Sequence, residues 1–396
     1  MALKFYPAKH NKLFIWIFQN LNFIELCTRV QFNILPSDIE TLRTIPLKTN
    51  LILIANHSDE LDPRVIMELS RRSGRRFTFM VNSEVFKEWF GTAKFCLQHI
   101  GSFSVERGAS DQVAIQYAID TVKNTNNILI MFPEGEIYNL NDSVQPFKTG
   151  AVHIGLEALK EIYAESSDQS VSILPAAIKY RYKHDIMSTL KKRIIKMEKH
   201  LSIDPNILDL QHELYRIMNK LMGSTNNAEA ETEDIDTLID RLEKTRESIV
   251  TEIEKKYTKT TSTGGDLFSR AQKMIFFIRE QISKQQVFSK DTQKQLEQDL
   301  QAMKKTIQMA TWQPQYIELN PSEEHLAETV MKLEKAVFNK KRVPALGKRE
   351  VFIRLLDPVD LSVALESYEA DPLTVMKNLS EELRTNLQEA IESNQN

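Results

Sequence analysis

The sequence predicts an α/β fold in which a long helical segment interrupts the chain before the last strand of a buried sheet. Short apolar runs alternate with helix-like segments over about residues 46–185. Amphipathic helical patterns replace them over 186–345, and strand character returns at 350–355. One late strand needs a sheet to join, so we expect it to complete the sheet that begins near residue 51.

The composition is that of a soluble globular protein. A length of 396 residues suggests two or three units at roughly 100–200 residues per domain. The net charge of −3 gives no sign of nucleic-acid binding. The two cysteines, Cys27 and Cys96, are too few for a disulfide framework or a zinc cluster and favour a reducing compartment. We therefore expect a cytoplasmic protein.

Residues 1–45 are predicted to form an apolar helix with a basic leading end. Lys4, Lys9, His10 and Lys12 precede the run from Leu13 to Phe18. No signal-peptide pattern is present, and no run reaches the ~18–20 apolar residues that span a bilayer. The helix is expected either to lie in a membrane interface, which makes the protein peripherally membrane-associated, or to pack on the domain's own core.

Residues 46–185 are predicted to form the α/β core. Its expected strands are 51–55, 77–81, 128–132 and 171–178, and its expected helices are 63–72, 109–123 and 149–163. Strands separated by helices of this length favour a sheet that is covered by helices.

Residues 186–345 are predicted to form a helical insertion. Apolar residues recur there every three or four positions, at Ile235, Leu238, Ile239, Leu242, Ile249 and Ile253, and again at Leu296, Leu300, Met303 and Ile307. This spacing indicates amphipathic helices, paired as a coiled-coil-like hairpin, that offer a surface to a protein partner. Residues 223–234 and 258–265 are expected to be connectors.

The end of the insertion and the return to the core also carry local signals. Asn320-Pro321-Ser322-Glu323 predicts a helix with Asn320 as its cap and Leu326, Val330, Leu333 and Val337 on its inner face. Residues 346–396 are predicted to supply the last strand and a helix after Asp371-Pro372, with Met376, Leu379, Leu383 and Leu387 on one side.

Two loops that follow predicted strands carry candidate catalytic residues. His57 follows the strand at 51–55, and Asp62 lies five positions on, at a helix start. An imidazole held by a carboxylate acts as a general base. Glu134 and Gly135 follow the strand at 128–132, where a carboxylate can grip substrate hydroxyls and glycine lets a ligand approach the backbone. Alternatively, Asp62 is an ordinary helix cap before Pro63, and Glu134 caps a turn.

Arg107 and Lys148 are candidate anion-binding residues. A guanidinium group offers a planar fork for phosphate, although most arginines form surface ion pairs. A metal site is a further alternative, because His57, Asp59, Asp62 and Glu134 are residue types that bind hard divalent cations in a hydrolase.

Taken together, these blocks resemble the glycerolipid acyltransferase family, typified by 1-acylglycerol-3-phosphate acyltransferases. The four motifs of the family are matched in order by Asn56-His57 to Asp62, Gly101 to Arg107, Phe132 to Gly135, and Val171 to Ala176. The resemblance covers about 46–185, the returning strand and residues 357–361, but not the helical insertion.

The resemblance implies a mixed β-sheet flanked by helices and an acyltransferase of phospholipid metabolism. His57, oriented by Asp62, would deprotonate a hydroxyl that attacks the thioester of acyl-CoA or acyl-carrier protein. Arg107 and Glu134-Gly135 would hold the acceptor at a membrane surface. The resemblance implies no metal and no cofactor beyond the acyl thioester co-substrate.

The chain departs from the family pattern after the third motif. The family usually continues Thr-Arg-Ser, whereas this chain has Glu136-Ile137-Tyr138. Two adjacent acids disfavour a dianionic ligand unless cations compensate, and Lys148, Arg64 and the pairs Arg71-Arg72 and Arg75-Arg76 are the candidates. The acceptor is therefore left open between phosphate-bearing and neutral. The same departure motivates a second function class, a catalytically degenerate helical scaffold.

Overall fold

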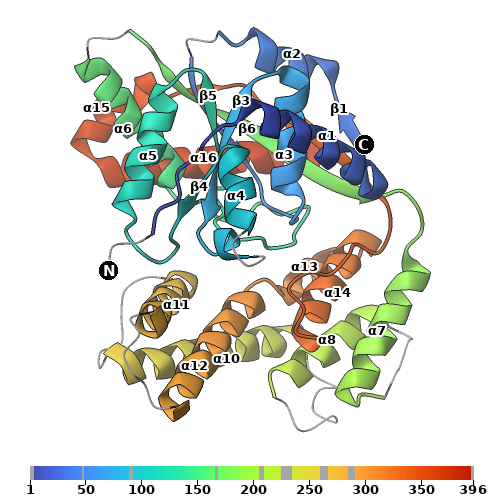
Figure 1. Cartoon of the computed structure of the whole chain (residues 1–396). Helices are drawn as coiled ribbons and strands as arrows, with labels where there is room; N and C mark the ends of the chain where they lie inside the picture. Colours follow the sequence, from blue (N-terminus) through green and yellow to red (C-terminus); the bar gives the residue numbers. More distant parts are fainter. Residues whose placement is uncertain are drawn as a thin grey trace. The chain divides into compact units, whose positions relative to one another are not determined.

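A computed structural model describes residues 4–46, 49–88, 92–165, 168–204, 209–223, 234–258, 266–283 and 290–393. They fall into two units (Figure 1). The sheet unit lies within residues 2–106, 110–183 and 348–396. The helical unit consists of residues 184–347 together with Arg107–Ala109. The predicted domain boundaries at 45, 185 and 345 stay a prediction.

The sheet unit contains one mixed sheet of eight strands in the described part of the chain. The strands are β1 (Val30–Ile34), β2 (Asn50–Ala55), β3 (Arg76–Asn82), β4 (Ser102–Val105), β5 (Asn127–Met131), β6 (Val171–Tyr182), β7 (Arg349–Leu355) and β8 (Val359–Asp360). Their order is β1-β7-β6-β2-β5-β3-β4, and β8 pairs with the start of β6. The strands β2 to β6 run parallel, whereas β7 is antiparallel to β6.

Helices cover both faces of the sheet, and alternating residues of each strand face one layer or the other (Figure 1). Leu51 and Leu53 of β2 pack toward α1 (Lys12–Arg29), α2 (Pro36–Thr44) and α3 (Asp62–Ser73), with α4 (Thr92–His99) beside them. Ile52 and Ile54 pack toward α5 (Gln112–Lys123), α6 (Gly150–Ala164), α15 (Leu365–Ala370) and α16 (Pro372–Ser393). The predicted mixed sheet flanked by helices is confirmed.

The helical insertion follows β6, as predicted, and strand β7 returns the chain to the sheet. The four predicted core strands are confirmed within a few residues, but β1, β4 and β8 were not predicted. The five residues of β1 lie within the segment that we expected to be helical throughout, and their alternating burial is too short a pattern to stand out beside a long helix.

Helix α1 packs on the sheet unit through one of its sides. Leu26 is fully buried in the core, and Phe14 and Phe18 lie against the same apolar cluster. The core-packing interpretation therefore holds for this side of the helix. In the described ranges, no helix combines the length and the apolar character that crossing a membrane requires.

The helical unit consists, in its described part, of α7 (Met187–Leu201), α8 (Leu210–Leu221), α10 (Ile235–Thr258), α11 (Leu267–Ser283), α12 (Lys290–Met309), α13 (Pro314–Leu319) and α14 (Glu323–Val337). The predicted apolar repeats lie on α10 and α12. A third helix, α11, shares their apolar core through Ala271, Ile275 and Ile278, so the arrangement is more than a hairpin. The predicted connectors lie largely in 224–233 and 259–265, outside the described residues.

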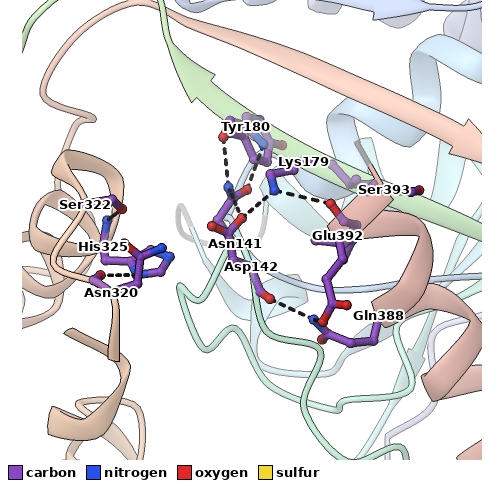
Figure 2. Close-up of polar contacts among 12 residues, drawn as sticks. Asn141, Asp142, Lys179, Tyr180, Asn320, Ser322, His325, Gln388, Glu392 and Ser393 are labelled. Carbon is purple, nitrogen blue, oxygen red and sulfur yellow. Dashed lines mark hydrogen bonds and ion pairs between the residues drawn. The ribbon is translucent and has the colours of Figure 1, made fainter. Parts of the chain in front are cut away.

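Helix α14 begins two residues later than we predicted. Its cap is Ser322, whose hydroxyl accepts a hydrogen bond from the backbone N–H of His325 at 3.2 Å. The predicted cap, Asn320, instead follows α13, and its carbonyl accepts from Nδ1 of His325 at 2.6 Å (Figure 2). Ser322 rather than Asn320 is the cap because Pro321 is not helical and the first helical residue is Glu323. The predicted inner face of Leu326, Val330, Leu333 and Val337 is buried.

Candidate active site

Two adjacent strands deliver the two candidate loops to the same edge of the sheet. Strands β2 and β5 run parallel, with Ile54 opposite Met131. The loop that carries His57 begins directly after β2, and the loop that carries Glu134 begins directly after β5. Because the carboxyl ends of parallel strands meet at one edge, the pairing brings the loops together.

His57 and Asp62 form a hydrogen-bonded pair. Nδ1 of His57 lies 3.0 Å from Oδ2 of Asp62. The imidazole stacks on the ring of Phe132, with 4.3 Å between ring centroids. A carboxylate acceptor places the imidazole proton on Nδ1. Among the described residues, Nε2 has no hydrogen-bond partner, so it is the nitrogen available for proton transfer.

Asp62 is not an ordinary helix cap. The cap position of α3 is Leu61, and Asp62 is the first residue of the helix. Besides His57, the fully buried Asp62 carboxylate accepts the backbone N–H of Asp59 at 2.8 Å and the hydroxyl of Tyr180 at 2.7 Å. Burial raises the pKa of Asp62, and the hydrogen bond from His57 opposes that rise most. Its contacts are those of a group that orients the imidazole.

Two asparagine side chains bind the backbone of β6 where that buried strand extends past β2. Strand β6 continues past the end of β2, which leaves the backbone of Ile178 and Tyr180 without a strand partner on that side. Asn56 accepts from the N–H of Ile178 at 2.8 Å and donates to its carbonyl at 2.9 Å. Asn141 does the same for Tyr180, at 2.7 and 2.8 Å (Figure 2). Each amide replaces one residue of a neighbouring strand.

The loop that carries Asn141 is fixed from its other side by Lys179. The buried Nζ of Lys179 pairs with Asp142 at 2.9 Å and donates to the carbonyl of Ile391, near the end of α16. Gln388 of α16 donates to the carbonyl of Asp142 at 2.9 Å (Figure 2). Helix α16 therefore helps to fix the loop that carries Asn141.

Glu134 holds the main chain of the catalytic loop. Its Oε1 accepts the backbone N–H of His57 at 2.8 Å, and the side chain is buried. Burial raises the pKa of Glu134 to about 8, although the N–H groups of His57 and Gln145 oppose this and the nearby Asp62 adds to it. Glu134 therefore does bind backbone N–H groups, as the turn-capping alternative supposes, and it links the loop after β5 to the loop after β2. Contact of Glu134 with a substrate stays a prediction.

Gly135 and Lys148 lie together on the second loop. Gly135 has φ +74°, and a Cβ at this position would lie 2.7 Å from Cε of Lys148. Glycine therefore allows the lysine side chain to cross the turn. The backbone N–H of Lys148 donates to the carbonyl of Pro133 at 2.8 Å, and its side chain is exposed. A cationic group is thereby placed beside the Glu134 turn.

Apart from Lys148, the candidate cations do not lie on the two site loops. Arg107 comes two residues after the end of β4 in the sequence and belongs to the helical unit. Arg71 and Arg72 stand about two and a half turns along α3 from Asp62 and both pair with Glu68. Arg75 donates to the carbonyl of Ile45 at 2.8 Å, and Arg64 pairs with Glu25 of α1. Of these cations, Lys148 is the one that lies on a site loop.

The residues proposed for a metal site bind different partners within the protein. Asp59 pairs with Arg349 at 2.8 Å, whereas Asp62 binds His57 and Tyr180. Within the described ranges, no three or more His, Cys, Asp or Glu side chains converge as ligands for a metal ion. The geometry gives the metal-dependent hydrolase no support.

Three residues of the site were not predicted from the sequence: Asn141, Tyr180 and Arg349. Tyr180 and Arg349 are on strands, where they read as ordinary strand residues, and Arg349 lies 290 positions from Asp59. The one available signal was the acidic loop Ser58-Asp59-Glu60, because a buried aspartate requires a cation from somewhere in the chain.

Residues 37–179 match the family model described as Acyltransferase. The matched segment contains His57, Asp62, Arg107, Glu134 and Lys148 and ends one residue before Tyr180. No curated protein matches the chain significantly.

Proposed function

Since residues 37–179 belong to the acyltransferase family, which includes the 1-acylglycerol-3-phosphate acyltransferases, we propose that the chain moves a fatty acyl group from an acyl thioester to a hydroxyl of a glycerolipid-like acceptor. The observation that carries the proposal is the 3.0 Å contact between His57 and Asp62 at the carboxyl end of β2. The donor is acyl-CoA or acyl-carrier protein.

The proposed reaction is a general-base acyl transfer. Nε2 of His57 takes the proton of the acceptor hydroxyl as its oxygen attacks the thioester carbonyl carbon. A C–O bond forms, the C–S bond breaks, and the proton passes from His57 to the leaving thiolate. Asp62 holds Nδ1 and stabilises the imidazolium that forms between these two transfers. Products are an ester and a free thiol, so the reaction needs no other reactant.

Lys148 is the proposed anchor for the polar part of the acceptor. Its exposed side chain crosses Gly135, on the loop that also carries Glu134. The ammonium group suits an anionic headgroup, whereas Glu136 on the same loop opposes a doubly charged one. Arg107, two residues after β4 in the sequence, is also proposed to bind the acceptor. A singly charged or neutral glycerolipid therefore fits these charges better than a phosphate monoester does.

The outward side of α1 supports work at a membrane surface. Leu13, Trp16, Ile17, Leu21 and Ile24 are between 41% and 67% exposed, and no charged residue occurs from Leu13 to Ile24. Phe95 of α4, 55% exposed, lies 5.7 Å from Phe14, so the apolar surface continues onto the neighbouring helix. A patch of this kind, with a tryptophan in it, suits the boundary between lipid headgroups and acyl chains.

The test is an acyl-transfer assay with labelled acyl-CoA and two acceptors, lysophosphatidic acid and monoacylglycerol. His57→Ala is expected to lose roughly 10²–10⁴ of the rate. His153→Ala is the matched control, because His153 of α6 bonds Tyr368 rather than a site residue. Transfer at the wild-type rate by His57→Ala contradicts the mechanism. A wild-type chain that transfers to no hydroxyl acceptor, from either CoA or carrier-protein thioesters, favours the degenerate scaffold.

A further inference from the structure

Two carboxylates are buried close together in the loop after β2. Asp62 is fully buried and Asp59 nearly so, and the backbone N–H of Asp59 donates to Oδ2 of Asp62. Two adjacent buried anions cost much free energy unless a cation and hydrogen bonds compensate. The compensation comes from the facing strands β6 and β7.

Arg349, the first residue of β7, supplies the cation. Its guanidinium is buried and lies 2.8 Å from Oδ2 of Asp59, while Oδ1 of Asp59 accepts the N–H of Leu61 at 2.8 Å. The same guanidinium lies over the ring of Tyr180, 4.5 Å from its centroid. Arg349 thus contacts both the aspartate that closes the loop and the tyrosine that bonds Asp62.

Tyr180 satisfies the oxygen of Asp62 that His57 does not use. Its hydroxyl donates to Oδ1 at 2.7 Å, and Oδ2 faces His57. The backbone of Tyr180 is held on both its N–H and its carbonyl by Asn141. The position of the hydroxyl is therefore fixed by the backbone of strand β6.

We propose that Tyr180 and Arg349 are positioning residues of the acyl transfer, which keep Asp62 ionised and directed at Nδ1 of His57. This inference rests on the proposed function. Neither residue is in the segment that matches the family model, because that segment ends at residue 179.

The rate of acyl transfer should depend on pH through the groups that surround Asp62. The charged or titratable groups around Asp62 are His57, Asp59, Glu134, Tyr180 and Arg349. The active pair has an ionised Asp62 and a neutral imidazole, and acid inactivates it by adding one proton to the pair as a unit. A hydrogen bond from Tyr180 and a nearby positive charge both favour the unprotonated pair. Loss of either should move the acidic limb of the profile to higher pH.

The first experiment compares Tyr180→Phe with Tyr368→Phe. Tyr368 is a matched control, since it is also buried and donates to a carboxylate, Glu157 at 2.8 Å, away from the site. For Tyr180→Phe we expect kcat to fall roughly 10-fold, the acidic limb to rise by about one pH unit, and KM to change little. The role of Tyr180 is overturned if the acidic limb of the Tyr180→Phe profile coincides with that of the wild type. It is also overturned if Tyr368→Phe shifts the acidic limb by the same amount.

The second experiment treats Arg349 and Asp59 as a pair. Arg349→Met leaves Asp59 buried without a cation, so we expect loss of folding or of most activity. The double variant Asp59→Asn with Arg349→Met should recover the fold, and Arg349→Lys should retain more activity than Arg349→Met. The control is Arg354→Met on the same strand, whose partner is Asp38 at 3.9 Å. A double variant that is no better than Arg349→Met overturns the pairing.

Failure of this inference can be told apart from failure of the proposed function. A wild-type chain without acyl transfer removes the function itself. An active wild-type chain in which Tyr180→Phe keeps the wild-type pH profile removes only the positioning role.

Discussion

The carboxyl group of Glu134 accepts the backbone N–H of His57 at 2.8 Å, so the loop after β5 fixes the main chain of the loop after β2. The contact joins residues 77 positions apart and is buried. A change in the conformation of either loop should therefore shift the backbone of His57 and, with it, the imidazole.

Burial of Glu134 predicts a pH-dependent contribution to stability. Its pKa is raised from 4.5 to about 8 in the folded chain, so the contribution is fully present below pH 4.5 and is lost as pH rises through 8. Wild-type stability should therefore fall relative to Glu134→Gln across this window, by up to roughly 5 kcal/mol. Chemical unfolding at a series of pH values measures it.

The matched control for this titration is Glu369→Gln, an exposed glutamate of α15. It should keep the wild-type pH slope. If Glu134→Gln also keeps that slope, Glu134 is ionised in the folded chain and the electrostatic account of the site is wrong. Some slope should remain in Glu134→Gln, because burial raises the pKa of Asp62 in the same direction.

A glycine comparison tests the placement of Lys148. Gly135 and Gly74 both have φ +74°, but a Cβ at Gly74 meets nothing within 4 Å, whereas at Gly135 it meets Lys148. Each alanine variant should lose about 1–2 kcal/mol of unfolding free energy, because left-handed backbone strains any residue with a Cβ. Only Gly135→Ala should also displace Lys148 and raise KM for an anionic acceptor.

The combination of Gly135→Ala with Lys148→Ala completes this comparison. If the effect on KM acts through the lysine, Gly135→Ala should change KM little once Lys148 is alanine. If Gly135→Ala raises KM equally with and without the lysine, the effect of Gly135 on KM does not act through Lys148. Steady-state kinetics with lysophosphatidic acid and monoacylglycerol supply the values.

Membrane binding should depend on the outward side of α1. Asparagine at Trp16, Leu21 and Ile24 removes apolar surface without touching Leu26 on the buried side, so the fold should be kept. Co-sedimentation with phospholipid vesicles should fall at least about 10-fold, because each of these side chains contributes on the order of 1 kcal/mol or more when it enters an apolar phase.

Two other exposed apolar residues serve as the control for α1. Leu319 and Val363 are 85% and 84% exposed but lie outside this surface, and their asparagine variants should sediment with vesicles like the wild type. If the α1 variant sediments as well as these controls, the helix is a packing element alone.

The fold and the first contacts of the site could be predicted because their signals are local. Strand β2 ends in a run of five apolar residues followed directly by Asn56-His57, and the Phe132–Gly135 turn follows a similar run. A sequence pattern places both at strand ends, and the parallel sheet then brings them together. The position of Asp62 relative to His57 depends on only five residues of chain.

What could not be predicted depends on partners distant in sequence. Tyr180 and Arg349 come close to the site only through the pairing of β6 with β7. Asn56 can bind the backbone of β6 only because β6 extends past the end of β2. The shift of the α14 cap from Asn320 to Ser322 has a local cause, since both residues are good caps and the chain conformation decides between them.

The distance of 290 residues between Asp59 and Arg349 also has a consequence during synthesis. Ribosomes add roughly 5–20 residues per second, so the cation for Asp59 emerges about 15 to 60 seconds after the aspartate does. During that interval the nascent chain holds its acidic loop without its counter-ion. The helical insertion, which lies between the two residues in the sequence, therefore separates in time the synthesis of the loop after β2 from that of its counter-ion.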